Sequence, residues 1–180
     1  MSMKSIDEFN QKARALKLLI LDVDGVLTDG RLFFNDHGTE YKCFHARDGH
    51  GIKLLQQIGI DVAVISGRKS NAVALRMKSL GVKYVFQGQE NKIPAFESLL
   101  TSMGVSASQV AHMGDDLPDL PIMTRVGLSI TVNDGHAAVK EYADWCSELN
   151  GGQGAVREIS DLILTACGQM DAVLSHYYAE

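Results

Sequence analysis

Asp22 and Asp24 are the first residues in the chain whose types and spacing point to chemistry. They follow an unbroken apolar run at 18–21, which has the length and composition of a short buried strand. Alternation along a strand places both carboxylates on the same side, with Val23 turned away. Two crowded carboxylates repel each other, and a divalent cation removes that conflict. Such oxygen ligands favour Mg²⁺, whereas an EF-hand calcium loop is excluded because Val26 stands where a third oxygen ligand is needed.

Later segments carry polar groups at comparable positions. Ser66 follows the apolar run at 60–65, and Asp115 closely follows the run at 110–113. Lys92 opens a helical segment after a further apolar run. Because the carboxyl ends of parallel strands meet at one edge of a sheet, we expect these groups to share one site with the first acidic pair.

The positions of these groups depend on alternating strands and helices. Hydrophobic runs between turn signals predict strands at 18–21, 60–65, 82–86, 110–113 and 127–132, with a last edge strand near 145–146. Helices are predicted at 5–16, 48–58, 70–80, 91–103, 117–124, 136–142 and 155–167. Asp48 is the expected N-cap of the second helix. The pattern indicates an α/β fold with one doubly wound, mostly parallel sheet, and we expect a single domain over residues 1–180.

A β-hairpin is predicted at about 31–44, where the turn residues 35–38 separate two aromatic-rich runs. Inserted directly after the first strand, it would protrude from the sheet instead of joining it. Its aromatic residues would then need cover: Phe33, Phe34, Tyr41 and Phe44. We expect a neighbouring subunit to cover them, because a lone two-stranded ribbon is marginal in water. Packing against their own domain is the alternative.

Composition excludes several classes of partner. The 180 residues carry a net charge of −5, which argues against a nucleic-acid or anionic membrane surface. An anionic substrate therefore needs a local group of cations. No apolar run has the length of a membrane span. The three cysteines are far apart in the sequence, which fits a reducing compartment, and we expect a cytoplasmic protein.

Taken in order, the motifs resemble those of the haloacid dehalogenase superfamily of phosphohydrolases. They are DVDGVLTDG at 22–30, SGR at 66–68, Lys92 and GDDLPD at 114–119. Two further stretches, FHARDG at 44–49 and GGQGAVRE at 151–158, are similar to one branch, the 3-deoxy-D-manno-octulosonate 8-phosphate phosphatases. The resemblance implies a Rossmann-like sheet without a separate cap domain and a homotetramer whose hairpins cap neighbouring sites. It also implies hydrolysis of that small acid sugar phosphate in lipopolysaccharide precursor synthesis.

The resemblance further implies a role for each catalytic residue. Asp22 would attack phosphorus to form an aspartyl-phosphate, and Asp24 would act first as general acid and then as general base. The Asp22 carboxylate, the Asp24 backbone carbonyl and the Asp115 carboxylate would hold Mg²⁺. Ser66 and Lys92 would bind the phosphoryl oxygens. Two further carboxylates would orient the metal shell and the lysine: Asp116 and Asp119.

The sugar part of such a substrate carries a carboxylate and many hydroxyl groups. Candidate contacts lie at the foot of the hairpin and in the segments that follow: His45, Arg47, Asp48, Gly49, Lys53, Arg68 and Arg76, with Lys92 on the phosphate. Arg157, at the start of the last helix after a glycine-rich loop, is a further candidate. For both Arg76 and Arg157, an exposed position on a helix surface is an equally good interpretation.

Two other functions stay open on the sequence. A phosphatase of a related nonulosonate 9-phosphate, a sialic-acid-like compound, would use the same residues on a sugar one carbon longer. A catalytically idle scaffold is expected to lack at least one of Asp22, Asp24, Lys92 and Asp115, all of which are present. A nucleotide-dependent kinase or NTPase is excluded, because the chain has no GxxxxGK(S/T) motif.

Overall fold

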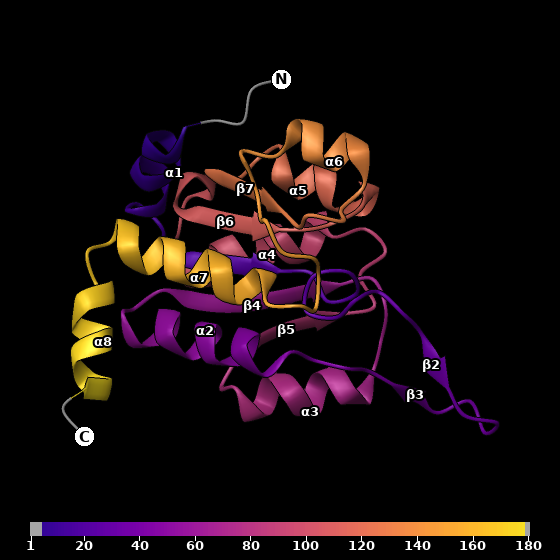
Figure 1. Ribbon diagram of the computed structural model, residues 1–180. Helices are drawn as coiled ribbons and strands as arrows, with labels where there is room; N and C mark the ends of the chain where they lie inside the picture. Colours follow the sequence, from indigo (N-terminus) through magenta and orange to yellow (C-terminus); the bar gives the residue numbers. More distant parts are fainter. Residues whose placement is uncertain (1–4, 179–180) are drawn as a thin grey trace.

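Parallel pairing of strands builds the centre of the molecule. The computed structural model describes residues 5–178 and orders the strands β5-β4-β1-β6-β7-β8 (Figure 1). Their bounds are β1 Leu18–Leu21, β4 Asp61–Ser66, β5 Tyr84–Gln87, β6 Val110–Met113, β7 Leu128–Thr131 and β8 Trp145–Cys146. All neighbouring pairs in this sheet are parallel. The predicted α/β class and doubly wound sheet are confirmed.

Helices cover both faces of the sheet (Figure 1). Their bounds are α1 Ile6–Ala13, α2 Ala46–Gln57, α3 Asn71–Ser79, α4 Ile93–Met103, α5 Leu120–Met123, α6 Ala137–Tyr142, α7 Ala155–Ala166 and α8 Met170–Tyr178. Leu19 and Leu21 of β1 pack with α1, α2, α3 and α7, whereas Leu18 and Ile20 pack with α4 and α5. Because both faces are largely apolar and covered, charged groups gather where the strands end. Within the described residues no helix is long and apolar enough to cross a membrane.

The register of the central strands places their ends side by side. Leu21 pairs with Val64 of β4 on one side and with Met113 of β6 on the other. The backbone N–H of Asp22 then donates a 3.0 Å hydrogen bond to the Met113 carbonyl. Asp22, the last residue of β4 (Ser66) and the loop after β6 therefore leave the sheet at the same edge.

The predicted hairpin is present and extends away from the sheet (Figure 1). Its antiparallel strands are β2 Phe33–Phe34 and β3 Glu40–Tyr41. Phe33, Phe34 and Tyr41 are 48%, 56% and 57% exposed, as an uncovered ribbon requires. Phe44 differs: it is partly buried and packs against the core of its own chain.

The start of α2 corrects one prediction. The helix begins at Ala46 with His45 as its N-cap, so Asp48 is not the cap. Asp48 is instead buried, and its Oδ1 accepts a 2.8 Å hydrogen bond from the backbone N–H of Arg157 at the start of α7. Burial raises the pKa of Asp48, and the hydrogen bond from α7 acts in the opposite direction. The first N–H groups of a helix can donate in this way because they lack partners within the helix. Asp48 thus joins α2 to α7.

Helix α8 was not predicted. None of its residues is fully buried, and its nine residues are too few for a strong periodic signal. Met170 and Val173 are partly buried and pack against the core. The hydroxyl of Tyr177 lies 3.1 Å from His50 Nε2 of α2. This tertiary contact adds to the apolar packing of α8 against the rest of the chain.

Small residues let α2 and α7 approach closely. A Cβ atom on Gly51 would lie 2.7 Å from Ser160 Oγ and 3.2 Å from Arg157 Cα. Ser160 is fully buried, and its hydroxyl donates a 2.7 Å hydrogen bond to the Val156 carbonyl within α7. The hydroxyl is held by this hydrogen bond and Arg157 Cα belongs to the helix backbone, so a side chain at position 51 would push against α7.

We expect Gly51→Ala to lower the free energy of unfolding by about 1–3 kcal/mol through overpacking against α7. In an open helix the same change would instead raise it by up to about 1 kcal/mol. Urea denaturation measures the difference. Gly49→Ala is the matched control in the same helix, because its new methyl group would meet the flexible end of Arg76 and cost less. A Gly51→Ala protein as stable as the wild type would contradict the close packing.

Candidate active site

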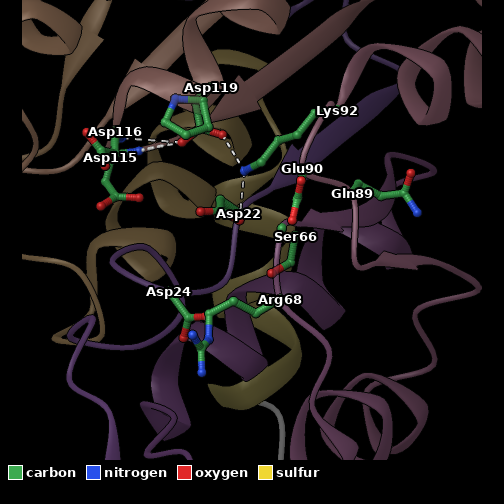
Figure 2. Close-up of a pocket in the computed structure, with 12 residues that line it drawn as sticks. Asp22, Asp24, Ser66, Arg68, Gln89, Glu90, Lys92, Asp115, Asp116 and Asp119 are labelled. Carbon is green, nitrogen blue, oxygen red and sulfur yellow. Dashed lines mark hydrogen bonds and ion pairs between the residues drawn. The ribbon is translucent and has the colours of Figure 1, made fainter.

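A cavity of about 470 Å³ opens where β1, β4 and β6 end. Its lining comes from the segments that follow several strands (Figure 2): Asp22, Asp24, Ser66, Gly67, Arg68, Gln89, Glu90, Lys92, Asp115, Asp116, Pro118 and Asp119. The structure thus brings together the carboxylates, the hydroxyl and the ammonium group that the sequence places in separate segments.

Asp119 is the buried centre of the hydrogen-bond network in this cavity. Its Oδ1 accepts a 2.7 Å hydrogen bond from Lys92 Nζ and lies 3.0 Å from His112 Nε2. Its Oδ2 accepts hydrogen bonds from the backbone N–H groups of Asp115 and Asp116, at 3.1 and 3.4 Å. Asp119 therefore fixes both the loop that carries Asp115 and the ammonium group of Lys92 (Figure 2).

Lys92 bridges two carboxylates. Besides its bond to Asp119, its Nζ lies 2.9 Å from Asp22 Oδ1, and its side chain is only 4% exposed. Lys92 is the N-cap residue of α4, and Pro94 follows within the first turn, where proline is tolerated. Burying an ammonium group costs several kcal/mol unless partners compensate, so the two carboxylates account for its position.

The carboxylates of the cavity outnumber the cations that neutralise them. Burial raises the pKa of Asp22 to about 6, and the charge of Asp119 adds to the effect against that of Lys92. Burial, with the negative charges of Asp22 and Asp119, raises the pKa of Asp115 to about 8. Burial also favours the neutral form of Asp119, but His112 and Lys92 outweigh it and hold that pKa well below its usual range. Burial opposes the charged form of Lys92, but the two acids raise its pKa.

This excess of carboxylates fits a divalent cation. Oxygen atoms of Asp22, Asp115 and Asp119 lie within 4.8 Å of one another. The Asp119 oxygens already accept hydrogen bonds, so Asp22 and Asp115 are the two left to bind an ion. Asp115 Oδ1 is buried and, among residues 5–178, has no hydrogen-bond partner, as expected of a ligand atom. Hard oxygen ligands of this kind suit Mg²⁺.

Gly25 shows why a glycine follows the first two aspartates. Its φ is +96°, in the region that favours glycine, and a Cβ atom there would lie 2.1 Å from Asp115 Oδ2. The Asp115 carboxylate therefore lies directly against the backbone of the loop after β1. Any side chain at position 25 would displace it.

Comparison with known proteins identifies the family. A family model described as haloacid dehalogenase-like hydrolase matches residues 84–159. Over 160 residues the chain is 46% identical to the 3-deoxy-D-manno-octulosonate 8-phosphate phosphatase KdsC of Escherichia coli K12, covering 89% of this chain and 85% of that protein. The chain belongs to this phosphatase family.

Solved structures of the family have the same fold. The Moraxella catarrhalis phosphatase, solved with magnesium ion, phosphate ion and KDO, is 40% identical with a TM-score of 0.94, covering 96% of this chain and 99% of that one. The cobalt-bound Haemophilus influenzae phosphatase is 44% identical with a TM-score of 0.87. The match covers 90% of this chain and 95% of that one. The predicted membership of the haloacid dehalogenase superfamily, and of this phosphatase branch, is confirmed.

Not all the residues that the family resemblance singled out line the cavity of this chain. Arg68 and Lys92 do, but six other predicted sugar contacts do not: His45, Arg47, Asp48, Gly49, Lys53 and Arg76. Lys53 instead borders a separate surface depression near the end of α3. The Arg157 guanidinium lies 2.8 Å from Asp161 on its own helix.

The cavity also involves residues that sequence reasoning missed. Lys42, at the end of the hairpin, forms an ion pair with Asp24, and His112 supports Asp119 from within β6. Gln89 and Glu90 line the cavity after β5. A histidine inside an otherwise apolar strand was the available signal for His112. For Lys42 there was no signal within its own segment, because its partner is in a different one.

We expect the metal-free phosphatase to lose stability as the pH rises from about 4 to about 8. Folded Asp115 keeps its proton up to about pH 8, whereas in the unfolded chain it loses the proton near its ordinary value. Between these values the folded state binds more protons, so the free energy of unfolding falls with increasing pH. Asp22 contributes in the same direction up to about pH 6. Thermal unfolding in a chelator at about pH 5 and about pH 8 measures the change.

Asp115→Asn is the control for this pH dependence, because an amide has no proton to lose. At about pH 8 the metal-free variant should be more stable than the wild type, and near pH 5 the gap should close. Mg²⁺ should stabilise the wild type and not the variant. Equal pH dependence in both proteins would contradict a raised pKa of Asp115.

Proposed function

We propose that the protein is a Mg²⁺-dependent phosphatase that hydrolyses 3-deoxy-D-manno-octulosonate 8-phosphate to the free sugar acid and phosphate, for lipopolysaccharide precursor synthesis. The observation that carries this proposal is the single cavity in which Asp22, Ser66, Lys92 and Asp115 meet. The E. coli relative named for this reaction, and the Moraxella structure with KDO, support the choice of substrate.

Asp22 is the nucleophile of the proposed reaction. One of its oxygens forms a bond to phosphorus while the bond from phosphorus to the sugar oxygen breaks, which gives an aspartyl-phosphate. Lys92, 2.9 Å from Asp22, offsets the repulsion between this carboxylate and an anionic phosphate. Lys92 and the hydroxyl of Ser66 at the end of β4 bind the phosphoryl oxygens.

Asp24 transfers the protons. It protonates the leaving sugar oxygen, which takes the electron pair of the broken bond. In the second step it accepts a proton from the water molecule that attacks the phosphorus of the aspartyl-phosphate. Phosphate then leaves, and the Asp22 carboxylate is restored.

Three groups would hold Mg²⁺: the carboxylates of Asp22 and Asp115 and the backbone carbonyl of Asp24. When bound, the ion supplies positive charge that attracts the anionic substrate and offsets charge on the phosphoryl oxygens. Asp119 keeps Asp115 and Lys92 in place. Asp116 contributes by accepting a 2.8 Å hydrogen bond from the Leu117 N–H, which starts the turn after the loop.

We expect Asp22→Asn to reduce phosphate release from 3-deoxy-D-manno-octulosonate 8-phosphate by at least about a thousandfold, because the amide is a poor nucleophile. Its melting temperature in chelator should equal or exceed that of the wild type, since a buried charge is lost. Asp61→Asn, at the exposed start of β4, is the matched control and should keep full activity. Wild-type rates in Asp22→Asn would exclude the covalent mechanism.

The substrate choice is tested by comparing kcat/KM for the octulosonate 8-phosphate with that for a nonulosonate 9-phosphate. A higher value for the octulosonate is expected. Release of phosphate from p-nitrophenyl phosphate, with and without Mg²⁺, separates an enzyme from an idle scaffold. A protein that hydrolyses none of these esters would contradict the proposed function.

Arg68 is the proposed contact for the sugar carboxylate, because it lines the cavity and its side chain is partly exposed. His45, Arg47, Asp48, Gly49, Lys53 and Arg76 stay predictions as sugar contacts. Their replacement should raise KM if they touch the sugar in the assembled enzyme.

The exposed hairpin supports a homotetramer in which each hairpin covers a neighbour's cavity. The rings of Phe33, Phe34 and Tyr41 are exposed on a hairpin that extends away from the body of the chain. Burying such rings in an interface is strongly favourable. We propose that residues 1–180 form one phosphatase domain with this insertion at about 31–44. The proposed enzyme acts in the cytoplasm on a small acid sugar phosphate.

We expect the wild type to sediment as a tetramer, and the double variant F33S/F34S as smaller species with little turnover, because the apolar contact is lost. Leu75→Ser on α3 removes an exposed leucine outside the hairpin and should keep the tetramer. Analytical ultracentrifugation with activity assays measures both properties. A fully active wild-type monomer would exclude capping by a neighbour.

A further inference from the structure

Four side chains of alternating charge form a closed ring at the side of the cavity: Asp24, Lys42, Glu40 and Arg68. Lys42 Nζ contacts Asp24 Oδ1 and lies 3.4 Å from Glu40 Oε1. Arg68 Nη2 lies 2.8 Å from the same Glu40 oxygen, and Arg68 Nε lies 3.7 Å from Asp24 Oδ2. Asp24 and Arg68 lie together, apart from the group around Lys92 (Figure 2).

The hairpin supplies half of this ring. Glu40 opens β3 and Lys42 follows its last residue, and this two-residue spacing in an extended segment places both side chains on the same side. On that side Lys42 contacts Asp24 and Glu40 contacts Arg68, which both line the cavity of the same chain, whereas Tyr41 between them is exposed. The hairpin is therefore attached by two charged side chains to the active site from which it extends.

Burial of the Lys42 side chain costs desolvation free energy, and filling space alone does not require a charged group there. Its side chain is 1% exposed, and a buried ammonium group is tolerated only where acids compensate for lost hydration. A methionine would fill the same volume without that cost. The ammonium group therefore points to a role exerted on its acidic partners.

The contact engages one oxygen of Asp24 and leaves the other available. Lys42 lies on Oδ1, and the Thr28 hydroxyl is also on Oδ1, at 3.5 Å. Oδ2 is buried and lies 3.7 Å from Arg68 Nε, but it accepts no hydrogen bond from the part of the chain that the structure describes. Oδ2 is thus the oxygen left to exchange a proton with a substrate.

We infer that Lys42 is a positioning residue that fixes Asp24 through Oδ1 so that Oδ2 meets the leaving oxygen. Glu40 and Arg68 complete the ring and restrain Lys42. This inference rests on the proposed phosphatase function. In the first step the phosphorus–oxygen bond to the sugar breaks, its electron pair stays on the sugar oxygen, and the proton from Asp24 Oδ2 neutralises that oxygen. Lys42 touches neither the phosphate nor the sugar in this step.

A positioning role has a signature that a general loss of structure or charge lacks. Alkyl and sugar phosphates have strongly basic leaving oxygens, which need the proton as the bond breaks. p-Nitrophenolate leaves without one. A misplaced Asp24 therefore slows the hydrolysis of alkyl and sugar phosphates more than that of p-nitrophenyl phosphate. The ratio kcat/KM reports this first step alone, because it includes steps only through departure of the leaving group.

The test measures kcat/KM of the full-length Mg²⁺-loaded enzyme for phosphate monoesters ranging from the sugar phosphate to p-nitrophenyl phosphate. Lys42→Met is expected to lose about 10–100-fold on the sugar phosphate and at most about threefold on p-nitrophenyl phosphate. Lys42→Arg should recover part of the loss on the sugar phosphate. Lys83→Met, at an exposed lysine before β5, is the matched control and should behave as the wild type.

Glu40→Gln keeps the ammonium group and weakens the ring, so it covers the case in which Lys42→Met does not fold. It should show the same selectivity with a smaller loss, about 3–10-fold on the sugar phosphate. An equal loss on all esters, or no loss, in whichever variant folds would overturn the role of Lys42. A wild type that hydrolyses no ester would instead refute the proposed function, so the two failures are distinguishable.

Discussion

The placement of Lys92 between Asp22 and Asp119 is the interaction on which the rest of the site depends. One ammonium group serves two carboxylates, and among residues 5–178 no cation forms an ion pair with Asp115 beside them. The chain thus concentrates negative charge at the point where an anionic phosphate must enter. The family reaction is possible there only if further positive charge arrives, and the buried, unpaired oxygen of Asp115 is where a Mg²⁺ ion can supply it.

The fold accounts for how this charge imbalance is maintained. Apolar strands buried on both faces leave the strand ends as the place where charged groups gather, and the register of β1, β4 and β6 makes those ends adjacent. Asp119 then connects the loop after β6 to Lys92. The hairpin adds a second network, in which Lys42 reaches back to Asp24. In the proposed tetramer the same hairpin would cover a neighbour's cavity, so one segment would serve two active sites.

Sequence patterns predicted what depends on local periodicity and on strand ends. The order of strands and helices, the protruding hairpin and the convergence of Asp22 with Ser66 and Lys92 follow from apolar runs and turn residues. Interactions between distant segments were not predictable in this way. Asp48 resembles an N-cap in sequence, yet it binds the first turn of α7, more than a hundred residues later. The contact of Lys42 with Asp24 and the packing of α8 depend likewise on tertiary approach.

The most direct test of the account is calorimetric titration of inorganic phosphate into the full-length protein with and without Mg²⁺. A cavity with excess carboxylates should bind phosphate at least about tenfold more tightly once Mg²⁺ is present, and phosphate should tighten Mg²⁺ binding by the same factor. Asp115→Asn should abolish this coupling. Phosphate binding of equal strength with and without Mg²⁺ would contradict the claim that metal and phosphoryl group share one pocket.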